Sequence, residues 1–205
     1  MDLLVVILGI TIAFGIDSWA EGRKNERVEQ KYLRNLQVDL KKDSARLVHL
    51  SDNIDTMQYS LRAVMKLYGN VNKSDSIGYY LTTLGNDIRF SPENYTYEAL
   101  QQSGDFRLVR SDSLRLELSR LYDDYKRYDE QEEVANQMFM RYIVDFLENY
   151  NPSLQSVTNP EMYNNQRFIF GINVYYSNLR NRERIIKGAA KSIDKVQRLI
   201  DESLS

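Results

Sequence analysis

The chain has 205 residues, which suffices for one domain of ordinary size together with a short anchoring segment. Its 27 Lys and Arg residues nearly balance 29 Asp and Glu residues, so the basic excess of nucleic-acid-binding proteins is missing and no nucleic-acid partner is expected. The absence of cysteine excludes disulfides, and the single histidine, His49, excludes zinc sites built from several imidazoles. Scarce glycine and proline favour long helices.

An apolar run opens the sequence: from Leu3 to Ile16 it contains only apolar residues, two glycines and one threonine. A helix over residues 1–19, rising about 1.5 Å per residue, would cross most of the roughly 30 Å apolar core of a bilayer. We therefore predict a transmembrane anchor over residues 1–19, with membrane lipid as its partner and with its first turn missing or lying upstream. A signal peptide is the first alternative, although no basic segment precedes the run and no small-x-small cleavage site follows it. A buried core helix is the second alternative.

Four residues of this segment are candidates for contact with the membrane or with a partner helix. Asp17 directly follows the apolar run, and Trp19 stands where aromatic rings favour the membrane interface, so we expect the carboxylate at the level of the headgroups. The alternative is an intramembrane carboxylate that pairs with another helix or carries protons. Gly9 and Gly15 leave grooves that another helix can approach, which indicates association within the membrane.

Residues 20–27 form a charged juxtamembrane segment, and residues 28–205 are expected to form an α-helical domain. From about Val28 to Tyr68, apolar residues recur at alternating steps of three and four, which places them on one stripe of a helix. Only Gly22 could interrupt a continuous helix from the anchor into this stalk, and Asp43 is the one polar exception on the stripe. The stripe consists of Leu33, Leu36, Leu40, Leu47, Leu50, Ile54, Met57, Leu61, Val64 and Tyr68.

A region of short elements follows the stalk. Gly69 suits the C-terminal cap of the long helix, and short helices are predicted over residues 75–86 and 95–103, the second capped by Gly104. Residues 106–110 are expected to form a brief extended piece.

Two further long helices are predicted, over about residues 111–150 and 161–199, because both carry apolar rows at seven-residue steps. Glu132 falls out of pattern in the first and Arg182 in the second. The fold class is therefore all-α: an N-terminal transmembrane helix that continues into a stalk, and an antiparallel bundle of three long helices plus short helices. Leu47, Ile54, Leu121 and Ile186 are expected in its core.

No catalytic residue, cofactor site or metal site is expected, because the sequence holds no phosphate-binding glycine loop, nucleophile elbow or metal-ligand cluster. The protein is therefore predicted not to be an enzyme. His49 is expected on the surface. Glu132 is expected at a bundle end or in a water-accessible layer, with a functional carboxylate as the alternative. The 15 tyrosines are expected mainly in the core, although they could also line a ligand pocket between helices.

Two segments, residues 5–43 and 90–125, carry motifs that resemble a known family. The first is an apolar span that ends in a polar residue and tryptophan, followed by a charged stretch. The second joins Tyr97, Leu100, Gly104 and Leu108 to the paired aromatics Tyr122 and Tyr125. They resemble an uncharacterised family of small Gram-negative membrane proteins. The resemblance implies a single-span inner-membrane protein with an α-helical soluble domain, and it brings no known activity.

Three functions fit these features. The first is a membrane-anchored interaction or scaffold module, an accessory subunit of an inner-membrane or envelope complex, with a protein partner or a second copy bound. The second is a single-span, sensor-like domain that binds a small-molecule ligand between its helices. The third is an accessory subunit of an ion-driven membrane motor that uses Asp17.

The side of the membrane is predicted from the charges that flank the span. Arg23, Lys24 and Arg27 follow it and by themselves favour a cytoplasmic domain. Relatives in the family that the chain resembles begin with a basic segment before the span, which would hold the N-terminus inside and reverse the orientation. We therefore expect a periplasmic domain, with a cytoplasmic domain as the alternative.

Overall fold

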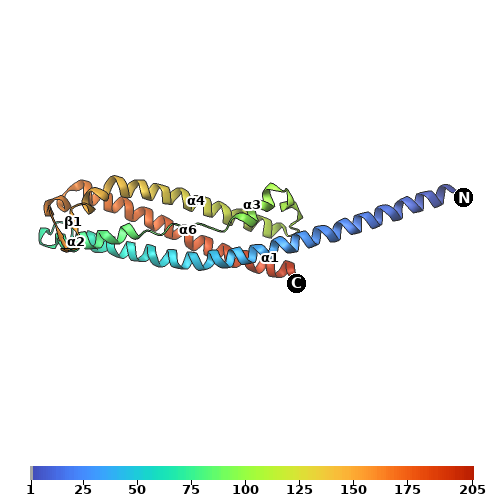
Figure 1. Ribbon diagram of the computed structural model, residues 1–205, viewed down its shortest axis with the longest axis horizontal. Coiled ribbons are helices and arrows are strands. Elements are labelled where there is room, and N and C mark those ends of the chain that lie inside the picture. Colours follow the sequence, from blue (N-terminus) through green and yellow to red (C-terminus); the bar gives the residue numbers. More distant parts are fainter. Residues whose placement is uncertain (1) are drawn as a thin grey trace. The chain divides into compact units, whose positions relative to one another are not determined.

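The computed structural model describes the backbone of residues 2–205 and the side chains of residues 7–205, and it confirms the all-α prediction (Figure 1). The α-helices are α1 (Asp2–Leu67), α2 (Ser74–Thr82), α3 (Tyr95–Gln102), α4 (Asp112–Tyr142), α5 (Val144–Leu147) and α6 (Gln166–Leu204). Short 3-10 helices cover Val71–Lys73, Thr83–Asn86, Asp105–Leu108 and Pro160–Asn164. Two strands, β1 (Tyr150–Asn151) and β2 (Ser156–Val157), pair antiparallel with Tyr150 opposite Val157.

The ends of the elements follow local signals in the sequence. Helix α1 passes Gly22 without a break, as predicted for a stalk continuous with the preceding segment. Gly69 and Gly104 both have positive φ values, 84° and 75°, which suits the residue after a helix end. Helix α6 begins later than predicted because residues 160–164 form a 3-10 helix, after which the Asn165 side chain accepts a hydrogen bond from the Phe168 N–H at 2.8 Å. The expected extended piece over residues 106–110 is instead mostly a 3-10 helix.

The chain divides into two compact units. Unit 1 comprises residues 1–42, 93–119 and 194–205, and unit 2 comprises residues 43–92 and 120–193. Helices α1, α4 and α6 each contribute to both units.

Unit 1 is held together by the apolar stripe of α1 and by polar contacts to the region around α3. Glu29 is 7 % exposed and one of its carboxylate oxygens accepts a hydrogen bond from the backbone N–H of Arg110 at 2.7 Å, while the other lies 3.3 Å from Arg110 Nε. The Tyr32 hydroxyl donates to Asp105 at 3.2 Å, so the turn after α3 is fixed against α1. The buried apolar residues of this unit include Leu33, Leu36, Leu40, Leu100, Val109, Leu114, Leu118, Val196 and Ile200.

In unit 2 the three long helices do not all alternate in direction, which corrects the prediction of an antiparallel bundle. Helix α6 runs antiparallel to α1, since Gln58 contacts Glu183 whereas Arg62, farther along α1, contacts Tyr176. Helices α1 and α4 run parallel in this unit, as the ribbon also shows (Figure 1). The reason is the connection between them, which returns along α1 before α4 begins.

This returning connection consists of residues 86–92, which lie beside α1 in unit 2; Asn86 ends a 3-10 helix, and residues 87–92 have no helix or strand structure. Asn53 donates to the Asn86 carbonyl at 3.0 Å and accepts from the Ile88 N–H at 3.2 Å. About two turns before Asn53 on α1, Arg46 donates to the Ser91 carbonyl at 2.8 Å. A long connection of this kind permits parallel neighbours, whereas the short loops that we expected between the long helices would impose antiparallel ones.

The predicted stripes form the core. Leu47, Ile54, Leu121 and Ile186 are at most 3 % exposed, as expected, and His49 lies on the surface. Two of the three polar exceptions to the stripes, Asp43 and Arg182, are also fully buried.

Among the described residues, no helix combines the length and apolar character that a membrane span requires. The predicted anchor over residues 1–19 includes Met1, which lies outside the described residues, and residues 2–6, whose side chains are not described. The part from Ile7 to Trp19 belongs to α1, and its large apolar side chains are between 52 and 69 % exposed.

We expect that replacing Leu47, Ile54, Leu121 or Ile186 by alanine will lower the free energy of unfolding by about 2–5 kcal/mol each, because each change leaves a cavity in a packed core. Urea unfolding followed by circular dichroism measures the loss. Val48→Ala and Leu116→Ala serve as controls, since these side chains are 59 and 51 % exposed, and should cost less than about 0.5 kcal/mol. Equal losses in both groups would contradict this assignment of the core.

Candidate functional site: a buried arginine beside a cavity

The candidate site lies in unit 2, where two polar exceptions to the apolar stripes meet. Arg182 of α6 is fully buried, and Glu132 of α4 keeps 11 % of its side chain exposed. Arg182 Nη2 lies 3.3 Å from Glu132 Oε1. A buried charge requires an opposite charge and hydrogen bonds. The pairing of Arg182 with Glu132 therefore explains why a charged residue interrupts the apolar stripe of α6 and of α4.

Arg182 is bound on several sides. Its Nη1 and Nη2 donate to the two carboxylate oxygens of Asp87 at 2.7 and 3.0 Å, the two-pronged geometry that makes arginine–carboxylate pairs strong. Nε and Nη2 also donate to the Tyr128 hydroxyl at 3.2 and 2.8 Å. The guanidinium carbon lies 5.3 Å from the centre of the Tyr128 ring.

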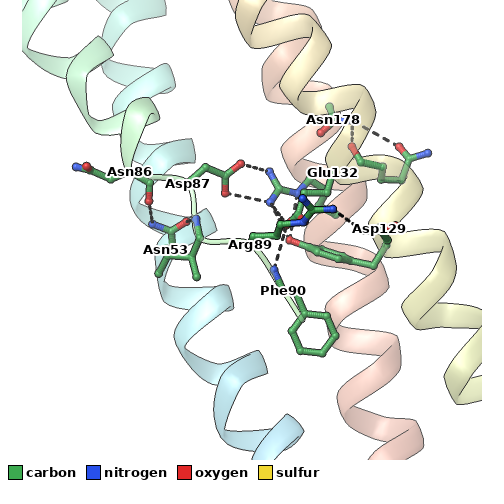
Figure 2. Close-up of polar contacts among 12 residues, drawn as sticks. Asn53, Asn86, Asp87, Arg89, Phe90, Asp129, Glu132 and Asn178 are labelled. Carbon is green, nitrogen blue, oxygen red and sulfur yellow. Dashed lines mark hydrogen bonds and ion pairs between the residues drawn. The ribbon is translucent and has the colours of Figure 1, made fainter. Parts of the chain in front are cut away.

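The returning connection supplies the other side of the site. Figure 2 shows Asp87, Arg89 and Phe90 directed from this segment toward α4 and α6, while Asn53 of α1 binds the segment from the opposite side. The Phe90 N–H donates to Glu132 Oε1 at 3.2 Å, and its ring packs edge-on against Tyr128 with centroids 5.8 Å apart. The connection is thus fixed by its backbone, its charge and its aromatic ring.

Burial and charge act in opposite directions on this cluster. Burial raises the pKa of Glu132, while the Phe90 N–H and the Arg182 charge oppose the shift. Burial alone would lower the pKa of Arg182, but its hydrogen bonds to Asp87 and its contact with Tyr128 outweigh that effect and raise it, so the guanidinium stays charged. Burial also raises the pKa values of Tyr128 and Tyr175.

A cavity of about 330 Å³ adjoins the cluster. Asp87 and Glu132 form part of its wall, so both carboxylates that contact Arg182 border the space directly. Arg89 stands at the rim with 76 % of its side chain exposed; its Nε lies 3.5 Å from Glu132 Oε2 and its Nη2 lies 3.3 Å from Asp129. The remaining lining residues are Leu84, Gly85, Glu133, Asn136, Phe139 and Tyr175.

The third polar exception, Asp43, lies elsewhere in unit 2. Its side chain is fully buried, lies 3.6 Å from Arg46 and faces the hydroxyl of Tyr125. Burial, and after it the charge of Asp43, raises the pKa of Tyr125. Asp43 therefore has a structural role in the packing of α1 against α4.

The residues predicted from sequence as contacts with a membrane or partner lie on α1 in unit 1. Gly9, Gly15, Asp17 and Trp19 are all exposed, and none of them belongs to the cluster around Arg182. The guanidinium carbon of Arg23 lies 5.5 Å from the centre of the Trp19 ring.

One prediction placed Glu132 at a bundle end; it lies instead within α4, keeps 11 % of its side chain exposed and lines the cavity. Asp87 and Arg89 were not predicted as site residues. They lie in a segment whose sequence has no helical pattern of apolar residues. The only signal in the sequence was indirect: Glu132 and Arg182 are charged residues on apolar stripes, so each needs a partner from another segment. Among the described residues, no group of His, Cys, Asp or Glu is arranged to hold a metal ion.

A comparison with protein families gives one match: a family of unknown function, DUF6090, matches residues 2–138. No curated protein and no solved structure matches the chain.

We expect Arg182→Met to lower the free energy of unfolding by about 3–5 kcal/mol, because it removes the arginine that pairs with Asp87 and leaves the largely buried Glu132 with only the exposed Arg89 as counter-ion. Urea unfolding measures the loss. The exposed Arg184→Met on the same helix is the matched control and should cost less than about 0.5 kcal/mol. Adding Asp87→Asn and Glu132→Gln to Arg182→Met should recover part of the stability. A loss for Arg182→Met no larger than the control's would refute the role of the cluster.

We also expect Glu132 to titrate above the ordinary glutamate pKa of about 4.3 and Glu183 to titrate below it. Burial causes the first shift, and the hydrogen bond from Lys187 chiefly causes the second. The stability that Glu132 contributes should therefore rise as the pH falls from its folded pKa to the ordinary value, because the folded state holds the proton more tightly. The stability that Glu183 contributes is fully present at pH values above the ordinary glutamate pKa, and it is lost as the pH falls through the lower pKa of Glu183 in the folded state. Carboxyl carbon NMR, assigned with Glu132→Gln and Glu183→Gln, measures both; the reverse order would contradict this account.

Proposed function

The chain belongs to the DUF6090 family of unknown function, and we propose that it is a membrane-anchored helical interaction or scaffold module. One observation carries this proposal: the exposed apolar side chains of the first part of α1, on a helix that continues into the packed units. Monomeric soluble proteins rarely expose continuous apolar surface of this kind, so we expect lipid or another protein to bury this part of α1.

The composition of the run supports a lipid cover. Every large apolar side chain described between Ile7 and Ile16 is more than half exposed, on all sides of the helix, whereas a docking face would be apolar on one stripe only. The predicted span over residues 1–19 adds the apolar residues that precede Ile7. Trp19 and Arg23 at its end suit the boundary between lipid and water.

The same segment supports association with another helix. A Cβ atom built at Gly9 or Gly15 would meet no described atom within 4 Å, so packing within the described chain does not require glycine at either position. Close approach of helices in membranes does favour such small residues. We propose a second copy or a protein partner in an inner-membrane or envelope complex as the occupant.

The proposed location is the inner membrane of a Gram-negative bacterium, with the helical units in the periplasm. This orientation rests on the resemblance to proteins with a basic segment before the span. A cytoplasmic location is the alternative, supported by Arg23, Lys24 and Arg27 after the run.

A second candidate function, binding of a small ligand, is favoured by the cavity beside Arg182 in unit 2. A pocket with a few converging polar groups and groups of shifted pKa is the usual setting of a binding site. The third hypothesis, in which Asp17 serves an ion-driven motor, stays a prediction.

We expect the full chain to stay in the membrane fraction after extraction with alkaline carbonate, and the variant Ile10→Lys/Phe14→Lys to be released. A lysine at the centre of a span costs roughly 3 kcal/mol. Val38→Lys/Val48→Lys is the control: it adds the same charge on the same helix, at residues 56 and 59 % exposed outside the apolar run, and should stay bound. Release of the unaltered chain would refute the anchor.

The same preparation tests the side of the membrane. The chain has no cysteine, so Leu154→Cys in the β1–β2 turn, where Leu154 is 72 % exposed, gives a single thiol. Labelling by a membrane-impermeant maleimide in intact cells with a permeable outer membrane indicates a periplasmic domain. Labelling only after lysis indicates the cytoplasm and overturns the proposed orientation.

A further inference from the structure

We propose that the cavity beside Arg182 binds a small organic cation, an ammonium group carried on an apolar body. This inference deepens the ligand-binding candidate above by naming the class of ligand, and it is independent of the membrane anchor.

The first argument is the charge around the cavity. Asp87, Glu132 and Glu133 line the cavity with three carboxylates, and Arg89 lines it with one guanidinium group. Outside the lining, Arg182 contacts Asp87 and Asp129 contacts Arg89, so these two further charges offset each other and the cavity keeps an excess of negative charge. An anionic ligand would be repelled, and a neutral one would leave the excess uncompensated.

The second argument is the state of the two arginines. Arg182 is fully buried and uses Nε, Nη1 and Nη2 in hydrogen bonds to Asp87 and Tyr128, so it is fixed in place. Arg89 is 76 % exposed; its Nε lies 3.5 Å from Glu132, and its Nη2 donates to Asp129, itself 62 % exposed, at 3.3 Å. Ion pairs made by so exposed an arginine contribute little stability, so Arg89 is readily displaced. Its guanidinium occupies the place where the charge of a bound cation would lie.

The third argument is an oxygen left without a hydrogen bond. Oε1 of Glu132 accepts from Phe90 and Arg182, but its buried Oε2 accepts no hydrogen bond from any described residue. A buried acceptor without a hydrogen bond is costly. An ammonium group that replaced Arg89 could donate to Oε2 and still have two donors for the neighbouring oxygens of Asp87 or Glu133.

The fourth argument is the apolar part of the wall. Phe139 and Tyr175 both line the cavity, with ring centroids 6.1 Å apart, and Leu84 adds an aliphatic surface. These groups can pack against the body of an amine, and a ring face also attracts a cation. A divalent metal ion would gain nothing from them, and the described carboxylates form no metal-ligating group. The combination therefore suits an organic cation.

The test uses the full chain in a non-ionic maltoside detergent and phosphate buffer, since zwitterionic detergents and amine buffers would supply competing cations. The probe is 2-phenylethylamine, measured by isothermal titration calorimetry. 2-Phenylethanol and phenylacetate have the same ring but are neutral and negatively charged. We expect saturable binding of the amine that weakens with salt, and at least about tenfold weaker binding of the other two.

Four variants assign the binding to this cavity. Glu132→Gln should weaken amine binding at least about tenfold. Glu133→Gln should also weaken it, and because Glu133 is exposed this variant should not disturb the fold. Arg89→Gln should leave binding equal or make it tighter, because it removes the competing internal cation. Glu130→Gln, an equal change of charge at an exposed position of α4 outside the cavity, should leave it unchanged.

Circular dichroism checks that each variant is folded. Tighter binding of phenylacetate or 2-phenylethanol than of the amine would overturn the inferred cation while leaving a ligand-binding function in place. Absence of saturable amine binding, equal effects of Glu130→Gln and Glu133→Gln, or a large loss with Arg89→Gln would each overturn the inference. None of these results depends on membrane extraction, so the two proposals succeed or fail separately.

Discussion

Unit 2 is organised around the need of one buried guanidinium for charge and hydrogen bonds. Arg182 projects from α6 into the core of unit 2, and its side-chain hydrogen bonds go to Asp87, Tyr128 and Glu132, none of which belongs to α6. Its partners come from α4 and from the returning connection, so the charge can be buried only when three segments distant in sequence come together. Apolar stripes alone would tolerate several alignments of the long helices. A buried ion pair of fixed geometry removes most of them.

The course of the returning connection follows from the same need. Asp87 must reach Arg182, and the Phe90 N–H must reach Glu132, and these two contacts hold residues 86–92 against α6 and α4. After the chain has returned along α1, α4 runs in the same direction as α1 within unit 2 (Figure 1). The parallel pair of α1 and α4 therefore follows from the position of Asp87, the partner of Arg182, on the connection between these two helices.

The contrast between what could and could not be predicted has a physical basis. Apolar residues at steps of three and four report that a face is buried, and they located the three long helices and core residues such as Ile54 and Leu121. They do not report which helix covers that face, so the direction of α4 relative to α1 was predicted incorrectly. Glu132 and Arg182 were recognised as exceptions because a regular pattern surrounds them. Asp87 and Arg89 lie where no pattern exists, and only the fold shows that they complete the site.

Because α1 is continuous, it also fixes the angle about the helix axis between the side chains of its first part and those that pack in unit 1. Each residue of an α-helix turns the next side chain by about 100° around the axis. Since no break separates the exposed run that ends near Trp19 from the buried Leu33 and Leu36, the number of residues between them sets the direction in which each points. Within unit 1, the stretch over residues 20–28 therefore behaves as a rigid spacer and not as a tether. A partner bound to the first part of α1 could therefore rotate the whole helix about the helix axis. A flexible linker in place of residues 20–28 would not transmit such a rotation.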